Sequence, residues 1–194
     1  MNVIDALEKR RALRSLAPVE VTKELVDDLV GAAHLAPSCM NNQSWRFVAI
    51  YEPEMKARFD EEVLSRGNAW AIDGSLYFVI FSKKEDDCAL KGERDYFLFD
   101  TGMATAFLML RATELDLIAH PIAGYDPDKA KEVLGIPEEY VAIAMVIVGK
   151  LADGISPRLK EWQVERETGG RQRRPLETVL HHNMYHPEQE PSKE

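Results

Sequence analysis

The stretch of sequence that decides the fold is Val141-Ala142-Ile143-Ala144-Met145-Val146-Ile147-Val148-Gly149. It has the length of a strand, is rich in branched residues and carries no charged side chain, so both of its faces are predicted to be covered. We therefore expect it in the middle of a sheet. The runs 45–51 and 75–81 predict two further strands, and residues 120–125 form a short extended piece that ends near a glycine.

Helical segments alternate unevenly with these strands. Apolar spacing over residues 3–13 indicates a first helix. Thr22 is the expected N-cap of a second helix, which Pro37 must end because proline cannot continue the hydrogen-bond ladder. A charged helix is predicted over residues 53–64, where a proline opens the segment.

The longest predicted helix covers residues 94–117. Its Phe, Met and Ala residues surround most of the helix circumference, which predicts burial inside the fold or against a partner subunit. We interpret this Met and Phe content as core rather than as a cofactor contact. A last helix begins after the N-cap Asp126 and ends at Gly135. Together the elements predict an α+β fold in which helices sandwich a central sheet.

Composition and charge indicate one globular domain. The chain has 194 residues, of which 45% are apolar and 29% charged. No run approaches the roughly 18 apolar residues of a membrane helix. Residues 1–180 are predicted to form a single domain, with a polar C-terminal tail at 181–194.

The N-terminus lacks the features of a signal peptide, so a cytoplasmic location is expected. The net charge of −9 argues against general binding to nucleic acid or to an anionic membrane.

The cysteines and histidines do not indicate a metal site. Cys39 and Cys88 are too few for a disulfide scaffold and lack zinc-type spacing, so we expect two reduced thiols. No histidine lies near Cys39 in sequence, and we interpret Cys39 as a small loop residue rather than a nucleophile. His181, His182 and His186 are interpreted as part of a solvated tail.

Residues 36–45 form an unusually polar connection between an apolar helix and a strand. After a proline they contain Ser, Cys, two Asn, a Gln and a second Ser. Such side chains, together with unpaired backbone N–H groups, suit a flat heterocycle with many hydrogen-bonding groups. The same residue types are common in turns, so a simple turn remains an alternative at this point.

Two groups of arginines, far apart in an acidic chain, are placed so that they can converge on one anion. Arg10, Arg11 and Arg14 lie at the end of the first helix, and Arg171 and Arg173 lie in a polar segment near the C-terminus. The sequence contains no glycine-rich dinucleotide loop, phosphate loop or Gly-x-Ser-x-Gly elbow. Arginines without an evident nucleophile or base are typical of a protein whose cofactor carries the reactivity.

Five pieces of the chain, taken in order, resemble the FMN-dependent nitroreductase family. They are Lys9-Arg10-Arg11-Ala12-Leu13-Arg14, residues 37–47, Asn68, Ile122-Ala123-Gly124-Tyr125-Asp126, and residues 171–177. The similarity runs from about residue 3 to residue 181. It implies an α+β homodimer with a central mixed, mainly antiparallel sheet, in which each FMN lies at the subunit interface.

The resemblance also assigns residues to the phosphate end of the flavin. Arg10 and Arg11 would hold the phosphate and the ribityl chain, and Arg171 and Arg173 would close on the phosphate. Ala12 would lie beside them. Family members commonly have serine at this last position, so the contact here would lack one hydroxyl.

At the ring, the resemblance implies a catalytic role for Arg14. Its positive charge would approach the pyrimidine edge and favour the anionic reduced flavin by stabilising charge near N1 and O2. Asn68 would bond the same edge, and Ala123 and Gly124 would leave backbone groups near flavin N5. The remaining ring contacts would come from the partner subunit: Pro37, Ser38, Cys39 and Asn41, with Gln43 close behind.

The activity implied is a ping-pong reaction. NAD(P)H would deliver hydride to flavin N5 and leave, and an electron-poor acceptor such as a nitroaromatic or a quinone would take its place. Two alternatives stay open: a flavin-binding or regulatory protein without physiological NAD(P)H turnover, and an interaction module whose arginines bind another phosphate ligand. Departures from the common family pattern occur at Cys39, Ser44, Asp116 and Ala123, where Ser, Pro, Gly and Glu are common, so the subgroup and acceptor stay open.

Overall fold

The computed structural model describes residues 1–89 and 94–187. Contacts within the chain divide it into two compact units, residues 1–160 and residues 161–194. The sheet and the helices that cover it belong to the first unit. A single flavin-binding domain that ends at residue 180 stays a prediction, and residues 188–194 of the predicted tail lie outside the described residues.

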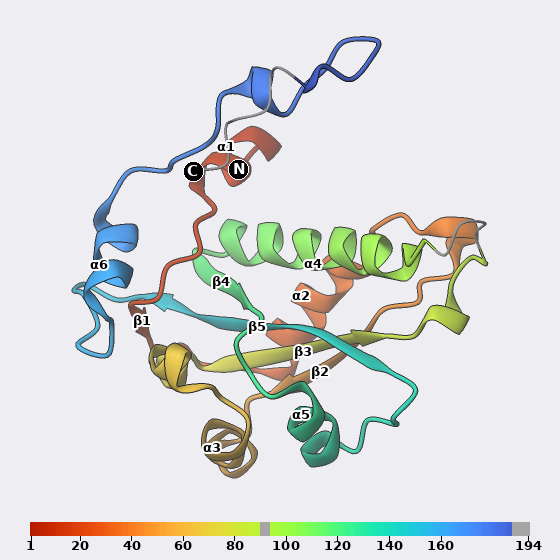
Figure 1. Ribbon diagram of the computed structural model, residues 1–194. Coiled ribbons are helices and arrows are strands. Elements are labelled where there is room, and N and C mark those ends of the chain that lie inside the picture. Colours follow the sequence, from red (N-terminus) through yellow and green to blue (C-terminus); the bar gives the residue numbers. More distant parts are fainter. Residues whose placement is uncertain (90–93, 188–194) are drawn as a thin grey trace. The chain divides into compact units, whose positions relative to one another are not determined.

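The first unit is built on a five-stranded sheet in the order β1-β5-β3-β2, with β4 also paired to β5 (Figure 1). The strands are β1 (Leu16–Ala17), β2 (Arg46–Ile50), β3 (Leu76–Ser82), β4 (Leu117–Ile122) and β5 (Val141–Leu151). Every strand pair among the described residues is antiparallel. The sequence prediction is confirmed for β5, which pairs with three other strands.

The helices follow the expected order. They are α1 (Val3–Lys9), α2 (Lys23–His34), α3 (Pro53–Glu62), α4 (Tyr96–Glu114), α5 (Pro127–Leu134) and α6 (Glu161–Thr168). Short 3-10 helices are η1 (Cys39–Asn41), η2 (Arg66–Asp73), η3 (Lys84–Asp86) and η4 (Leu176–Thr178). None of the helices within the described ranges combines the length and the apolar character that crossing a membrane requires.

Several helix caps confirm the sequence interpretation. The Thr22 side chain accepts a hydrogen bond from the Leu25 N–H, and Asp126 caps the start of α5. Gly135 ends α5 with a φ of 66°, a left-handed conformation that glycine adopts without steric cost.

Two helix ends and two further elements differ from the sequence prediction. The first helix ends at Lys9 rather than near residue 13, because the backbone of Arg10 leaves the helical conformation. The long helix ends at Glu114, because Asp116 turns the chain with a φ of 60° and Leu117 already begins β4. The two-residue strand β1 and the charged helix α6 were not predicted, since neither carries a long periodic apolar pattern.

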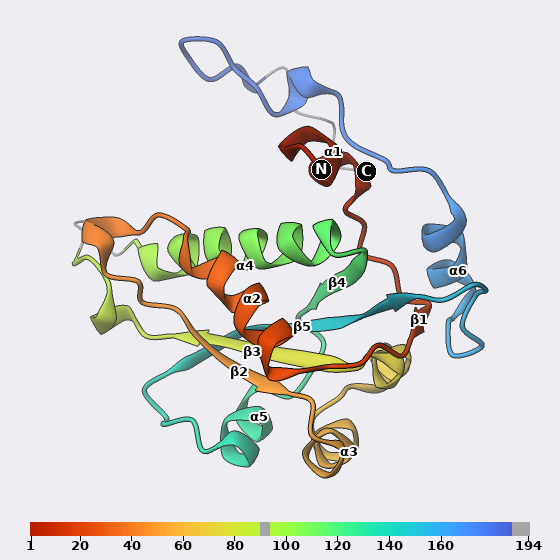
Figure 2. The same cartoon turned by 180° about the vertical axis from the view of Figure 1, so that it is seen from behind.

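Two hydrophobic cores lie on opposite faces of the sheet. In β3, Leu76, Phe78 and Ile80 pack with residues of α2 and α4, whereas Tyr77 and Val79 pack with residues of α3 and α5. Figures 1 and 2 show these helix pairs on the two sides of the sheet. Alternate residues of a strand point to opposite faces, so a strand buried throughout requires both layers.

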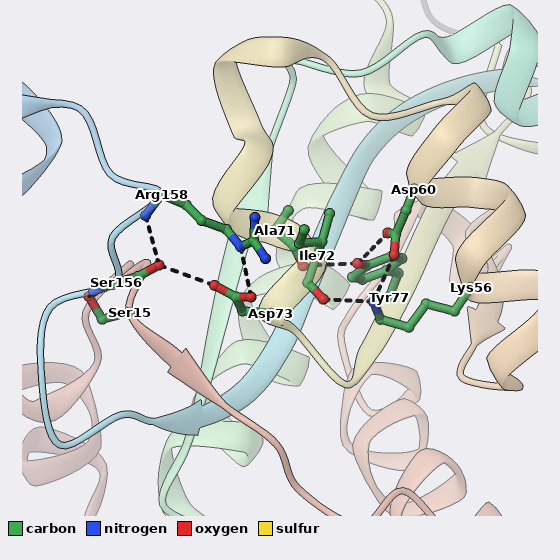
Figure 3. Close-up of polar contacts among 9 residues, drawn as sticks. All are labelled: Ser15, Lys56, Asp60, Ala71, Ile72, Asp73, Tyr77, Ser156 and Arg158. Carbon is green, nitrogen blue, oxygen red and sulfur yellow. Dashed lines mark hydrogen bonds and ion pairs between the residues drawn. The ribbon is translucent and has the colours of Figure 1, made fainter.

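A network of polar contacts fixes the end of η2 next to α3 (Figure 3). The Tyr77 hydroxyl lies 2.6 Å from Asp60 Oδ1 and 2.9 Å from the carbonyl oxygen of Ala71. Lys56 Nζ donates to the carbonyl oxygen of Ile72 at 2.8 Å. Burial is the main cause that raises the pKa of Tyr77, so its hydroxyl remains a hydrogen-bond donor at any ordinary pH.

The other side of η2 is held by Asp73 (Figure 3). Its carboxylate accepts hydrogen bonds from Arg158 Nε and from Ser156 Oγ, each at 3.1 Å. The Ser156 N–H donates in turn to Ser15 Oγ at 3.0 Å. The last three residues of η2 are therefore anchored to α3, to β3 and to the segment after β5, which holds the C-terminal end of η2 in a defined position.

Candidate functional site

Two predicted cofactor residues, Asn68 and Gly124, meet in the structure. An isolated antiparallel bridge between Leu64 and Tyr125 brings their two segments together. Asn68 Nδ2 and Ser65 Oγ donate to the carbonyl oxygen of Gly124 at 2.8 and 2.6 Å. These bonds fix the backbone at Gly124, and the neighbouring Ala123 is exposed.

Gly124 leaves a space that a side chain would fill. A Cβ atom at this position would lie 2.6 Å from Asn68 Nδ2 and 3.3 Å from Ser65 Oγ. The first distance is too short for a real contact, so the position requires glycine for close approach rather than for an unusual φ. The Asn68 amide therefore packs directly against the exposed Gly124 backbone, in the direction that a side chain would take.

Arg14 joins Asn68 and Gly124 through Trp70. The Arg14 guanidinium carbon lies 5.9 Å from the centroid of the Trp70 ring, within cation–π range. Trp70 is fully buried, and its indole N–H donates to Asn68 Oδ1 at 3.2 Å. Three residues predicted to contact the flavin ring, Arg14, Asn68 and Gly124, are therefore brought together.

Arg10, Arg11 and Ala12 lie in the connection that follows α1. The Arg10 N–H donates to the carbonyl oxygen of Ala6 at 2.9 Å, and both arginines are half-buried while Ala12 is exposed. The preceding Lys9 forms an ion pair with Asp116 and lowers the pKa of that carboxyl group. This contact connects the end of α1 to the turn between α4 and β4.

The polar connection 36–45 has a strained and internally bonded backbone. Met40, Asn41 and Gln43 have φ values of 51°, 59° and 49°, which are uncommon for residues other than glycine. Ser38 Oγ accepts the Gln43 N–H at 3.0 Å, and Gln43 Nε2 donates to the carbonyl oxygen of Asn41 at 3.0 Å. Strain of this kind concentrates at functional sites, which favours a binding role over a simple turn.

Cys39 and Cys88 form a disulfide, so the prediction of two reduced thiols is wrong. Their Cα atoms lie 6.0 Å apart, within the usual range for a disulfide. The sequence separation of 49 residues hid the pairing, because only the fold brings η1 next to the segment that follows η3.

Asp100 in α4 binds the backbone of the polar connection 36–45. The Cys39 N–H donates to Asp100 Oδ2 at 2.7 Å, and the carboxyl group is fully buried. Its Oδ1 atom has no hydrogen-bond partner among the described residues. Burial raises the pKa of Asp100, although the bond from Cys39 acts in the opposite direction.

The predicted ring contacts therefore form two groups, which lie at opposite ends of the sheet. Figures 1 and 2 place η1, with the connection 36–45, at one end and η2 at the other. Arg171 and Arg173 belong to the second unit and are exposed, and Arg173 donates to the carbonyl oxygen of Gln172 at 2.8 Å. That these two arginines approach the phosphate stays a prediction.

The sequence interpretation missed Ser65, Trp70, Asp100 and His120. Two of them carried a usable signal: Ser65 and Trp70 flank Asn68, which was already assigned to the site. Asp100 lies in a helix that was interpreted as core, where an acidic residue is out of place unless it has a partner. His120 opens the short extended piece 120–125, where its local sequence gives no sign of a role.

The comparison with family models identifies the class of protein. The model of the nitroreductase family matches residues 7–69 and 66–150. The chain belongs to the nitroreductase family.

Individual relatives agree with this assignment. A solved structure described as an oxidoreductase containing FMN is 29% identical, with a TM-score of 0.81 over 96% of this chain and 94% of its own. FMN reductase (NAD(P)H) of Bacillus subtilis (strain 168) is 26% identical over 184 residues, covering 85% of this chain and 73% of the relative. Protein DrgA of Synechocystis sp. is 27% identical over 177 residues, covering 77% of this chain and 84% of the relative.

The disulfide leads to a first testable prediction. Replacing Cys88 by Ser should lower the free energy of unfolding by about 2–4 kcal/mol, because the bond closes a long loop of the unfolded chain. Cys39→Ser should cost a similar amount, and the double variant should cost no more than either alone. Urea denaturation measures the effect. Rapid alkylation of both thiols in the native protein without reductant would contradict the disulfide.

Asp100 leads to a second prediction, on pH. Burial raises the pKa of Asp100, so the folded protein favours the neutral acid. As pH rises from about 4, the ordinary Asp pKa, through the raised value, Asp100 therefore lowers the stability of the folded protein increasingly. Asp100→Asn should remove this dependence and still accept the Cys39 N–H. Asp100→Leu cannot accept it and should loosen the connection 36–45. Unfolding midpoints at several pH values test Asp100→Asn, and amide hydrogen exchange in the connection 36–45 tests Asp100→Leu. Identical pH profiles of stability for Asp100→Asn and wild type would refute the proposed linkage.

Proposed function

We propose that the chain is an FMN-dependent oxidoreductase that takes hydride from NAD(P)H and passes it to an electron-poor acceptor such as a nitroaromatic or a quinone. The observation that carries this proposal is the meeting of Arg14, Asn68 and Gly124 around Trp70 at one corner of the fold. Membership of the nitroreductase family, a family of FMN-dependent oxidoreductases, supports it, as do relatives named for FMN and NAD(P)H.

The residues at this corner fit the pyrimidine edge of a flavin. Asn68 Nδ2 has two hydrogens, and one of them is bound to the Gly124 carbonyl oxygen. Among the described residues no acceptor takes the other hydrogen, which leaves it for a ring carbonyl. Arg14 supplies a cation near it, and the missing side chain of Gly124 lets the Asn68 amide lie against the backbone. A donor, a cation and an exposed stretch of backbone suit a flat heterocycle that gains negative charge at one edge.

Bound FMN would supply the hydride chemistry, taking hydride from NAD(P)H at N5 and transferring it to the acceptor in a ping-pong sequence. Arg14 would stabilise the negative charge that develops at the pyrimidine edge. Asn68 would orient the ring through its amide, and Gly124 would allow close approach of the backbone. Arg10 and Arg11, with Arg171 and Arg173, would bind the phosphate as charged hydrogen-bond donors.

The site is proposed to form between two copies of the chain. Its second wall would be the connection 36–45, with Pro37, Ser38, Cys39, Asn41 and Gln43 of the partner facing the ring. The opposite positions of η1 and η2 on the sheet support this arrangement, because one copy does not bring the two groups together (Figures 1 and 2).

Exposed apolar side chains support a homodimer. Val3 and Ile4 of α1 and Phe99 and Phe107 of α4 are exposed, Phe99 by 57%. A groove of about 460 Å³ lies between α1, α2 and α4, with Val3, Leu35 and Phe107 among its lining residues. An apolar groove of this kind, with further exposed apolar side chains on the same helices, is typical of a protein–protein interaction site.

A cytoplasmic location is part of the proposal, because NAD(P)H is supplied inside the cell. In that compartment disulfides are rare, and those that form are usually transient. The Cys39–Cys88 bond of this chain is an exception to that pattern.

The experiment that tests the proposed function is anaerobic reduction by a nicotinamide. The purified protein should be yellow or take up added FMN, and NADH or NADPH should bleach the bound flavin rapidly; an acceptor should restore the colour. A protein that stays colourless with FMN would refute the proposal. Flavin that binds but does not bleach with either nicotinamide would favour the regulatory alternative.

The arginines give a quantitative form of this test. Arg10→Ala and Arg171→Ala should each weaken FMN binding by about 1.5–3 kcal/mol, because each removes a charge-assisted hydrogen bond to the phosphate. Arg58→Ala is the matched control, since Arg58 pairs with Glu62 on the surface of α3. Quenching of FMN fluorescence measures the affinity, and equal affinities for all three variants would refute the assigned phosphate site.

The dimer is tested on α4. Phe99→Glu and Phe107→Glu should convert the protein to a monomer and lower its FMN content, because a charge in an apolar interface has no partner. Met55→Glu on α3 is the control, since Met55 is also a partly exposed apolar helix residue but belongs to another face. Light scattering after gel filtration gives the mass. A wild-type monomer with full FMN content would contradict the shared site.

A further inference from the structure

Trp70 touches two of the residues assigned to the flavin ring, although no ligand can reach it. Its side chain is fully buried in the core beneath η2. Its N–H donates to Asn68 Oδ1 at 3.2 Å, and its ring lies under the Arg14 guanidinium at 5.9 Å. One buried side chain therefore connects the cation and the amide of the proposed pyrimidine contact.

The bond from Trp70 sets the orientation of the Asn68 amide. A buried indole N–H needs an acceptor, and Asn68 Oδ1 provides it. With Oδ1 turned toward the indole, Nδ2 faces the Gly124 carbonyl oxygen at 2.8 Å. If the amide were flipped, Nδ2 would face the indole N–H and Oδ1 would face the Gly124 carbonyl oxygen. A donor would then meet a donor, and an acceptor would meet an acceptor. Trp70 and Gly124 thus select the orientation in which an N–H group remains for a ligand.

His120 completes the support of Arg14. Its ring packs against Trp70 with a centroid distance of 4.6 Å. Its Nδ1 lies 3.0 Å from the carbonyl oxygen of Leu13, and because a carbonyl oxygen only accepts, Nδ1 carries the hydrogen. Arg14 is therefore held at its side chain by Trp70 and at the preceding peptide by His120.

We propose that Trp70 is a positioning residue that holds Arg14 and Asn68 against the same edge of the flavin. This inference rests on the proposed function. Trp70 acts through its two contacts: its ring face keeps the Arg14 charge where negative charge develops, and its N–H keeps the Asn68 donor directed at the ring. The network around η2 keeps Trp70 itself in place (Figure 3).

The test compares the midpoint potential of bound FMN in the holoprotein of four variants with that of wild type. These are Trp70→Leu, Arg14→Gln, the double variant Trp70→Leu/Arg14→Gln, and the control Phe59→Leu. Phe59 is a fully buried aromatic residue of the same core, and its ring contact is with Tyr77. A dye-coupled anaerobic titration gives the potential, and thermal unfolding of each variant gives its stability.

Trp70→Leu should lower the preference for reduced over oxidised flavin about tenfold, which is a shift of about −30 mV for a two-electron couple. Arg14→Gln should shift the potential similarly. The double variant should shift it no further, because non-additivity shows that one residue acts through the other. Phe59→Leu should lower the unfolding temperature and leave the potential unchanged.

Trp70→Phe separates the two contacts and covers the case in which Trp70→Leu does not fold. It keeps the ring face under Arg14 and removes the N–H, so the potential should stay close to that of wild type. The affinity for oxidised FMN should fall about tenfold, because the Asn68 amide loses its fixed orientation. Affinity equal to that of wild type would overturn the Asn68 part of the proposal.

The outcomes distinguish this proposal from the proposed function. A wild-type protein that binds no FMN would refute both. If wild type binds FMN and is reduced by NAD(P)H, but Trp70→Leu changes only stability, or adds its shift to that of Arg14→Gln, the positioning role alone is overturned.

Discussion

Burial of β3 and β5 on both faces is the constraint on which the rest of the structure depends. All seven residues of β3 are buried, and alternate side chains enter two separate cores. Both faces must therefore carry helices: α2 and α4 on one, α3 and α5 on the other. The polar connections are consequently left at the ends of the sheet. The strained connection 36–45 lies at one end and η2 at the other, so the layered core also determines where ligand-binding groups can occur.

The sequence predicts the elements well where one local signal decides them. The apolar run 141–149 becomes β5, Thr22 caps α2, and Gly135 ends α5. It fails where contacts between distant segments decide. The Cys39–Cys88 bond spans 49 residues, and the meeting of Asn68 with Gly124 depends on a bridge between Leu64 and Tyr125. The assignment of both residues to one site came from resemblance to a family, because no spacing rule places them together.

The departures from the common family pattern affect the structure in two different ways. Asp116 replaces a common glycine at a position with a φ of 60°, and the ion pair with Lys9 accompanies this unfavourable conformation. Cys39 replaces a common serine and forms a covalent bond that ties η1 to a distant segment. These two positions alter how the chain is held together. Ala12 and Ala123 are exposed, and replacement of their common counterparts removes polar groups from the surface where a ligand would bind.

A mixed-dimer experiment tests most directly whether the flavin site is shared between two chains. One variant carries Gly124→Val, which places side-chain atoms against Asn68, and the other carries Ser38→Trp, which disrupts the connection 36–45. Neither homodimer should bind FMN. If each site combines η2 of one copy with η1 of the other, the heterodimer has one intact site and should bind one FMN per dimer. A heterodimer that binds no FMN, under conditions in which the wild-type protein binds it, would contradict a shared site.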